Sequence, residues 1–298
     1  MENSIYFDSV ATYNVFGNHK TYHPLISVLD LSKAKPNKIW HMRMGIYAIS
    51  LKGTAVGDLR YGKGYYDFQE GTLVFFSPGQ VLHIESDEEW HQPRGLMLVF
   101  HPDLIRGTSL AKHFNDYSFF SYQVNEGLHL SEEEKKIVKD CFAKIETETK
   151  RPVDKHSKKV IVANLELLLT YCVRFYDRQF ITRETVNKGI LERFEQLLDG
   201  YLVSDKPQNI GLPTVRYFAD ELNLSANYFG DLFKKETGKT PLEYIQLKII
   251  ETAKERLFDD QKTISQISYE LGFKYSSHFT RFFKNQVGST PNEYRMHN

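Results

Sequence analysis

The chain has 298 residues, of which 41% are hydrophobic and 26% are charged, which is ordinary for a soluble globular protein. Its 38 Lys and Arg balance 38 Asp and Glu, so overall charge gives no argument for a nucleic-acid partner. Two distant cysteines, Cys141 and Cys172, exclude a disulfide scaffold and favour a reducing compartment. No signal-peptide pattern opens the chain, and its most apolar stretch, 160–175, is too short to span a bilayer. We therefore expect a cytoplasmic protein with no membrane partner.

Residues 1 to about 125 alternate short runs rich in Val, Ile, Phe and Tyr with Gly and Pro turn signals. The runs cover residues 25–31, 45–51, 73–76, 81–85 and 95–100. Short strands at such close spacing predict a β-sandwich or β-barrel.

The pattern becomes helical at Ser131. Ser131 and Glu134 have the spacing of a capping box, which predicts a helix to about residue 149 that Pro152 ends. A second helix is predicted over about 154–178. Its apolar residues repeat at alternating spacings of four and three, at Ile161, Leu165, Leu168, Cys172 and Phe175. This a/d pattern fits either packing within the same domain or a homodimer through residues 154–178.

From about Val186 onward the sequence predicts helices, interrupted by a polar loop over 205–213. Two segments, 228–244 and 278–294, then match at a constant offset. The matching pairs are Phe229/Phe279, Phe233/Phe283, Lys234/Lys284, Gly238/Gly288, Thr240/Thr290, Pro241/Pro291, Glu243/Glu293 and Tyr244/Tyr294. Such a duplication indicates two copies of one supersecondary unit.

Each copy, 214–237 and 263–287, predicts a helix-turn-helix. A small residue, Ala219 or Ser268, allows the two helices to cross closely. Four positions later Asn223 or Gly272 suits a turn with positive φ. Such a turn exposes the second helix to the DNA major groove. An intervening helix from Pro241 to about residue 258 would hold the units on successive groove segments, about 34 Å apart.

Residues 190–294 resemble the DNA-binding domain of AraC/XylS-family transcription regulators. The strings that carry the resemblance are Ala219-Asp-Glu-Leu-Asn-Leu-Ser225, Phe233-Lys-Lys-Glu-Thr-Gly-Lys-Thr-Pro-Leu-Glu-Tyr-Ile245, Ile267-Ser-Tyr-Glu-Leu-Gly-Phe273, Phe279-Thr-Arg-Phe-Phe-Lys284 and Pro291-Asn-Glu-Tyr-Arg295.

The resemblance implies an α+β protein that regulates transcription and is not an enzyme. An N-terminal domain, residues 1–180, would combine a cupin-like β-barrel with a helical dimerisation or linker segment, about 131–178. It would sense a small molecule, dimerise, or do both. An all-α domain, 186–298, would bind double-stranded DNA, and RNA polymerase is a possible partner. The alternatives are a front domain used only for protein pairing and a cupin-type enzyme.

The expected DNA-binding residues lie on the second helix of each unit. They are Ser225, Asn227, Tyr228, Asp231, Lys234, Lys235, Ser276, Ser277, His278, Thr280, Arg281 and Lys284. Arg281 occupies the position of the family's base-contacting arginine and can pair with guanine, worth about 1–3 kcal/mol of discrimination. Asp231 departs from the family pattern, which often has Arg there. Asp could accept a hydrogen bond from cytosine, but its charge opposes phosphates. The lysines are either phosphate contacts or ordinary solvated side chains.

The charge balance ranks the two units. Residues 261–298 contain five Lys or Arg and two Asp or Glu, whereas residues 213–241 contain four of each. The second unit therefore has the more favourable field for a polyanion.

The front half offers candidates for an effector pocket, because such pockets favour aromatic side chains with a few polar groups. The candidates are Trp40, Tyr47, Tyr65, Phe76, His83 and Trp90, and core packing is the competing role for each. Residues 71–85 resemble a cupin hairpin that carries His83. One histidine without a His-x-His pair cannot form a metal site, so we expect no metal and no cofactor.

Overall fold

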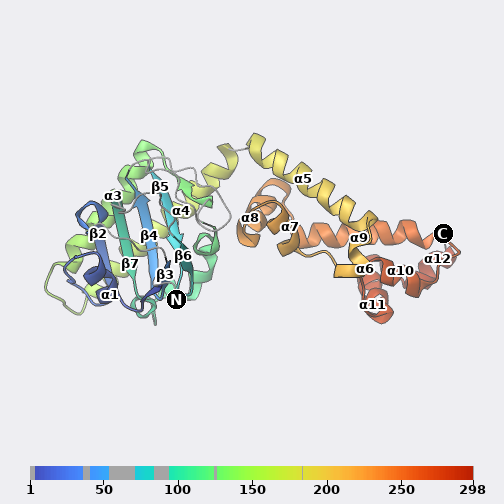
Figure 1. The fold of residues 1–298 in the computed structure, drawn as a ribbon, viewed down its shortest axis with the longest axis horizontal. Helices are drawn as coiled ribbons and strands as arrows, with labels where there is room; N and C mark the ends of the chain where they lie inside the picture. Colours follow the sequence, from blue (N-terminus) through green and yellow to red (C-terminus); the bar gives the residue numbers. More distant parts are fainter. Residues whose placement is uncertain are drawn as a thin grey trace. The chain divides into compact units, whose positions relative to one another are not determined.

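The computed structural model describes residues 4–35, 41–53, 71–83, 94–123, 126–182 and 184–297. The chain divides into two compact units, Met1–Thr182 and Arg183–Asn298 (Figure 1). Within the described ranges, no helix combines the length and the apolar character needed to cross a membrane.

The strands of the first unit form two sheets. The smaller sheet has the order β1 (Ser4–Phe7), β3 (His41–Met44) and β6 (Val81–His83), and β1 runs parallel to β3. The larger sheet is antiparallel, in the order β2 (Ile26–Asp30), β7 (Gly95–Phe100), β4 (Tyr47–Lys52), β5 (Thr72–Phe76) and β8 (Leu128–His129). Each of the five predicted runs overlaps a strand, and β1, β3 and β8 lie outside those runs.

The expected closed barrel is wrong for the part of the chain that the structure describes. There, β2 and β8 end the larger sheet, and no ladder joins them. The outer edge of β8 pairs with a helix instead. The His129 N–H donates to Gln179 Oε1 (2.8 Å), and Gln179 Nε2 donates to the Gly127 carbonyl (3.2 Å). The prediction of a β-rich region holds for this unit.

The period-two alternation of strands separates two cores. Ala48, Phe76 and Val99 face the smaller sheet, where Phe7 and Met44 cover them. The opposite face carries the neighbouring residues of the same strands. Phe75, for example, contacts Phe119 (ring centroids 4.3 Å apart) and Tyr176 of the helical layer. The larger sheet is therefore covered on both faces.

Short helices also occur where strands and turns alone were expected. They are α1 (Val10–Phe16), α2 (Ser109–His113) and the 3-10 segments η1 (Leu31–Lys33), η2 (Pro102–Leu104), η3 (Phe114–Asp116) and η4 (Ser118–Ser121). Elements of two turns or fewer contain too few residues for a 3.6-residue pattern to emerge.

Two long helices complete the first unit. α3 (Glu132–Thr149) begins at the predicted Ser131 capping box, and α4 (Ser157–Thr182) follows. The a/d residues of α4, from Ile161 to Phe175, are all buried within this unit. Of the two interpretations left open, packing within the domain is therefore the correct one for this seam.

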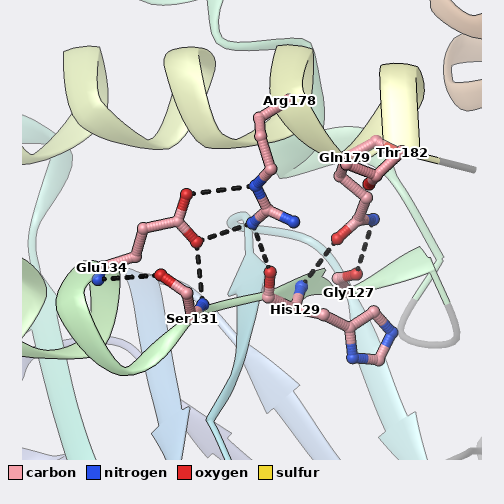
Figure 2. A network of polar contacts seen from close by, with 7 residues as sticks. All are labelled: Gly127, His129, Ser131, Glu134, Arg178, Gln179 and Thr182. Carbon is pink, nitrogen blue, oxygen red and sulfur yellow. Dashed lines mark hydrogen bonds and ion pairs between the residues drawn. The ribbon is translucent and has the colours of Figure 1, made fainter.

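A polar network fixes α3 and α4 to the sheet (Figure 2). Arg178 of α4 donates two hydrogen bonds to Glu134 of α3 (2.6 and 3.1 Å) and a third to the carbonyl of His129 in β8 (2.7 Å). Glu134 also accepts from the Ser131 N–H (2.8 Å). One arginine therefore joins three elements that lie far apart in the sequence.

The second unit contains only helices among its described residues. They are α5 (Glu184–Val203), α6 (Lys206–Ile210), α7 (Val215–Glu221), α8 (Ala226–Thr237), α9 (Pro241–Leu257), α10 (Ile264–Glu270), α11 (Ser276–Val287) and α12 (Pro291–His297). The segment predicted as a polar loop, 205–213, contains the short helix α6. One apolar cluster extends from Phe194 of α5 to Phe283 of α11.

Candidate nucleic-acid interface

The two turns have the predicted backbone geometry. Asn223 adopts a φ of 57° and Gly272 a φ of 92°. In each turn the next N–H returns to the carbonyl of the small residue: Leu224 to Ala219 (2.9 Å) and Phe273 to Ser268 (3.0 Å). The helix pairs α7–α8 and α10–α11 are therefore equivalent supersecondary units.

Gly272 has a further reason to lack a side chain. A Cβ at this position would lie 2.7 Å from the carbonyl carbon and oxygen of Gly211 and 2.9 Å from the Pro207 carbonyl oxygen. Contacts this short do not occur between real Cβ atoms and backbone. The end of α6 therefore approaches the second turn closely.

Side-chain caps begin most of these helices. The hydroxyls of Thr214, Ser225 and Thr263 accept hydrogen bonds from the backbone at the starts of α7, α8 and α10 (3.2, 3.1 and 3.2 Å). The helix α11 differs, because its N-cap residue Tyr275 makes no such bond. The second turn is also longer: residues 271–275 separate α10 from α11, whereas residues 222–225 separate α7 from α8.

The expected contacts of α11 are accessible, and Ser277, His278, Arg281 and Lys284 share the side that faces away from the core. Phe279 and Phe283 are fully buried and define the opposite side. The exposed residues are Ser276, Ser277, His278, Arg281 and Lys284. Thr280 is half-buried, and its hydroxyl donates to the Ser276 carbonyl (3.0 Å). The structure thus brings six of the predicted residues together along one helix.

The first helix-turn-helix, α7–α8, presents fewer of the expected DNA contacts. Asn227, Lys234 and Lys235 are exposed on α8, and Asp231 is half-buried. The hydroxyl of Ser225 is engaged as the helix cap.

Tyr228 does not belong to this surface, because only 5% of its side chain is exposed. It neighbours Phe229 and precedes Leu232 by one helical turn, so it lies on the inward side of α8. The prediction of a DNA contact from Tyr228 is therefore corrected.

Sequence reasoning overlooked Lys274 and Tyr275, which precede α11. The Tyr275 ring is 55% exposed and meets the ring of His278 edge-on, with centroids 5.3 Å apart. Lys274 Nζ lies 5.8 Å from the Tyr275 ring centroid. Alignment of the two copies could have revealed them, because they replace the single serine at position 225.

The helix α9 joins the units as a fixed spacer. It begins at the predicted Pro241, within a capping box between Thr240 and Glu243. At its far end Arg256 donates to the Leu202 carbonyl (2.6 Å), and Arg295 donates to the Leu257 carbonyl (2.9 Å). Its 17 residues span about 25 Å.

A surface hydrogen bond also joins α5 to α9. The Tyr244 hydroxyl donates to Glu195 (2.7 Å). Burial, together with this carboxylate, raises the pKa of Tyr244 above its usual range.

Among the predicted effector residues, the structure describes two side chains. Tyr47 stacks on Phe100 (4.9 Å between ring centroids) and also contacts Phe114 and Phe120, and its burial raises its pKa. Phe76 lies in the core between the sheets. Both therefore have packing partners.

Of the remaining predicted effector residues, Trp40, Tyr65 and Trp90 fall outside the described residues, and for His83 the structure describes the backbone, in β6, and not the side chain. Across the described ranges, no group of three His, Cys, Asp or Glu residues is placed to hold a metal ion.

One polar atom in the first unit was not predicted. The Ser50 hydroxyl is fully buried in β4 and has no hydrogen-bond partner among the residues that the structure describes. Its cross-strand neighbour is Met97, whose sulfur accepts a hydrogen bond from the Tyr13 hydroxyl (2.8 Å). A serine within an otherwise apolar core has no sequence signal that distinguishes it from a surface serine.

Comparison with known proteins agrees with this geometry. Residues 218–297 match the family described as "Helix-turn-helix domain". The chain is 37% identical over 82 residues to the uncharacterized HTH-type transcriptional regulator YobQ of Bacillus subtilis, covering 28% of this chain and 34% of that protein. The Transposon Tn10 TetD protein of Escherichia coli is 34% identical over 123 residues, covering 41% of this chain and 80% of TetD.

A solved regulator from Chromobacterium violaceum, described as AraC-type and DNA-binding, is 23% identical, covering 38% of this chain and 94% of that structure, with a TM-score of 0.32. The shared helix-turn-helix region and the coverage of TetD identify the relationship. The chain belongs to the AraC-type helix-turn-helix transcriptional regulators, a family of DNA-binding proteins and not of enzymes.

Proposed function

We propose that this regulator reads two DNA segments, one with α8 and one with α11, and that α11 supplies most of the sequence specificity. The observation that supports this most directly is the accessible side of α11. Arg281 and Ser277 lie there together, Ser276 is exposed in the first turn of the helix, and Phe279 and Phe283 anchor the opposite side.

The side chains of the second helix-turn-helix, α10–α11, suggest distinct roles in DNA binding. Arg281 can donate two hydrogen bonds to one guanine. Ser276 and Ser277 lie in the first turn of α11, where backbone N–H groups and hydroxyls favour a phosphate. Lys284, one helical turn beyond Thr280, can contact a second phosphate.

The first helix-turn-helix, α7–α8, has a weaker set of candidate DNA contacts. Asn227 can read adenine, and Asp231 can accept from cytosine N4. Lys234 and Lys235 favour phosphates, but the acidic residues of this unit balance its basic ones. We therefore assign α8 a smaller share of the specificity.

Selection of binding sites from a random duplex pool tests this assignment. With the full chain at physiological salt, we expect two short blocks about one helical turn, roughly 34 Å, apart. Arg281→Ala should remove one block, whereas Arg174→Ala, an exposed arginine of α4, should remove none. Weak, salt-sensitive binding without an enriched motif would overturn the proposal.

For the first unit we propose effector sensing in the core between the two sheets. The buried Ser50 hydroxyl supports this, since a buried polar atom without a partner is destabilising and calls for an explanation. A ligand with one polar group could supply the missing hydrogen bond. Thermal shifts against a metabolite panel test the idea, because a ligand that binds only the folded state raises the melting temperature.

If no metabolite shifts the wild-type chain, the alternative of a front unit used only for protein pairing is favoured. The observation behind that alternative is an exposed apolar stripe on α4, formed by Val160, Ala163 and Leu167. Because the a/d seam of α4 is buried, we propose this stripe as the homodimer surface. Leu167→Glu should then convert a dimer to a monomer in sedimentation velocity. Contact with RNA polymerase rests on the family resemblance alone.

A further inference from the structure

The second recognition helix begins differently from the first. In α8 the N-cap is Ser225, whose hydroxyl accepts from the Tyr228 N–H. In α11 the N-cap is Tyr275, and no side chain caps the helix. The extra residue in the second turn, after Gly272 and Phe273, places Lys274 and Tyr275 where the first unit has one serine.

Tyrosine at this position lacks a structural benefit that would explain it. Ser, Thr, Asp and Asn stabilise a helix N-terminus because their side-chain oxygens accept a backbone hydrogen bond. The Tyr275 side chain makes no such hydrogen bond, and the residue is 55% exposed. Residue types that lower the stability of their local structure tend to occur at functional positions.

The ring is nevertheless held in a defined orientation. It meets His278 edge-on at 5.3 Å, and Lys274 lies beside it. Tyr275, His278 and Arg281 follow one another at spacings of three residues, so they form one line along the exposed side of α11. An apolar ring therefore extends the line of polar contacts beyond the start of the helix.

We propose that Tyr275, supported by His278, is a specificity-determining contact that places its ring against a thymine methyl group in the block read by Arg281. Among the base edges in the major groove, only thymine presents a methyl group, and apolar side chains recognise it by contact. Lys274 contacts the adjoining phosphate. This inference rests on the proposed function of α11 as a major-groove reader.

The first experiment compares stability and DNA binding in the full chain. The probe is a duplex selected from a random pool by the wild-type protein. Tyr275→Ser supplies a cap, so it should raise the melting temperature by about 2–4 °C. The same change should weaken binding by about tenfold, the loss expected for one base contact. Tyr275→Phe should retain wild-type affinity.

Two controls separate this role from simpler ones. Tyr269→Ser removes a similarly exposed tyrosine (59%) from α10 and should leave affinity unchanged. The salt dependence of binding should be the same for Tyr275→Ser and wild type, because no phosphate charge pair is lost. Parallel loss of stability and affinity in Tyr275→Ser would show a structural role and overturn the proposal, as would a stabilised variant with wild-type affinity.

The methyl contact is tested by replacing each thymine of the Arg281-dependent block with deoxyuridine. One replacement should weaken wild-type binding and have no effect on Tyr275→Ser. Equal effects on both proteins, no effect on either, or a block without thymine would overturn the assignment. If Arg281→Ala weakens binding but Tyr275→Ser does not, only this inference fails. If Arg281→Ala also has no effect, the proposed function fails as well.

Discussion

At the scale of single residues, the two copies allow each side chain to be compared with its counterpart. Ser268 and Ala219 occupy the same place where the helices cross, and both are buried. Ser268 is only 1% exposed, and within the described part of the chain its hydroxyl has no hydrogen-bond partner. The first copy shows that the site needs only a methyl group.

We expect Ser268→Ala to raise the free energy of unfolding by about 1 kcal/mol, because it removes a desolvated hydroxyl. Urea denaturation of the full chain measures the change. The reciprocal Ala219→Ser should be destabilising by about 1–3 kcal/mol for the same reason. A destabilised Ser268→Ala would show that the hydroxyl has a partner in solution.

Gly272 provides a second residue-scale prediction. An alanine there must adopt a positive φ and also meets the Gly211 backbone at 2.7 Å. We expect Gly272→Ala to lower the free energy of unfolding by at least about 2 kcal/mol. Gly288 is a matched control, since its φ is 89° and its Cβ would meet nothing within 4 Å.

Gly288→Ala should therefore cost only the backbone strain, about 1–2 kcal/mol. The difference between the two variants, measured in the same denaturation series, isolates the contact between α6 and the second turn. Equal losses would mean that α6 moves away without penalty.

At the scale of elements, the sequence predicted long capped helices well. The predicted capping box at Ser131 is present, and the same pairing of a hydroxyl with an acid or amide three residues later occurs at Thr240 and Thr263. These signals are local, so a single sequence contains all of the necessary information. The strand β8 and the helix α6 are also formed by short stretches of sequence. Contacts with distant residues determine them, so they were not predicted from local signals.

The network around Arg178 is an example of such contacts, and it gives an element-scale prediction. Arg178→Met removes three hydrogen bonds that join α3, α4 and β8. Because the arginine is partly exposed, we expect a loss of about 1–2 kcal/mol in unfolding free energy. Arg174→Met, one turn earlier on the exposed side of α4, should change it little.

If Arg178→Met matched Arg174→Met in denaturation experiments, the network would contribute nothing measurable to holding α3 and α4 on the sheet.

At the scale of the whole molecule, a net charge of zero conceals local fields. Lys284 lies on the exposed side of α11, within the more basic copy. Replacing it with Gln should reduce the slope of log Kd against log salt by about one unit while preserving the selected sequence. Lys159→Gln on α4 should leave the slope unchanged. Fluorescence anisotropy at several salt concentrations measures both.

The candidate interface was easier to predict than the first unit. Duplication identified α8 and α11, and the buried phenylalanines indicated which residues face outward. Tyr228 was wrongly assigned to the DNA-binding surface because the buried side of α8 is wider than the positions of Phe229 and Phe233 indicate, and it includes Tyr228. The barrel was not obtained because closure depends on which strand edges meet, and the Gln179 side chain occupies the outer edge of β8.

The helices on either side of α9 each complete their own turn and recognition surface. A substitution on the exposed side of α8 therefore leaves α11 intact. During evolution one helix-turn-helix of such a chain can acquire a new sequence specificity, while the unchanged one still binds its part of the operator. Asp231, at the position equivalent to Arg281, is a divergence that this redundancy would tolerate. New regulatory targets can thus arise through intermediates that retain DNA binding throughout.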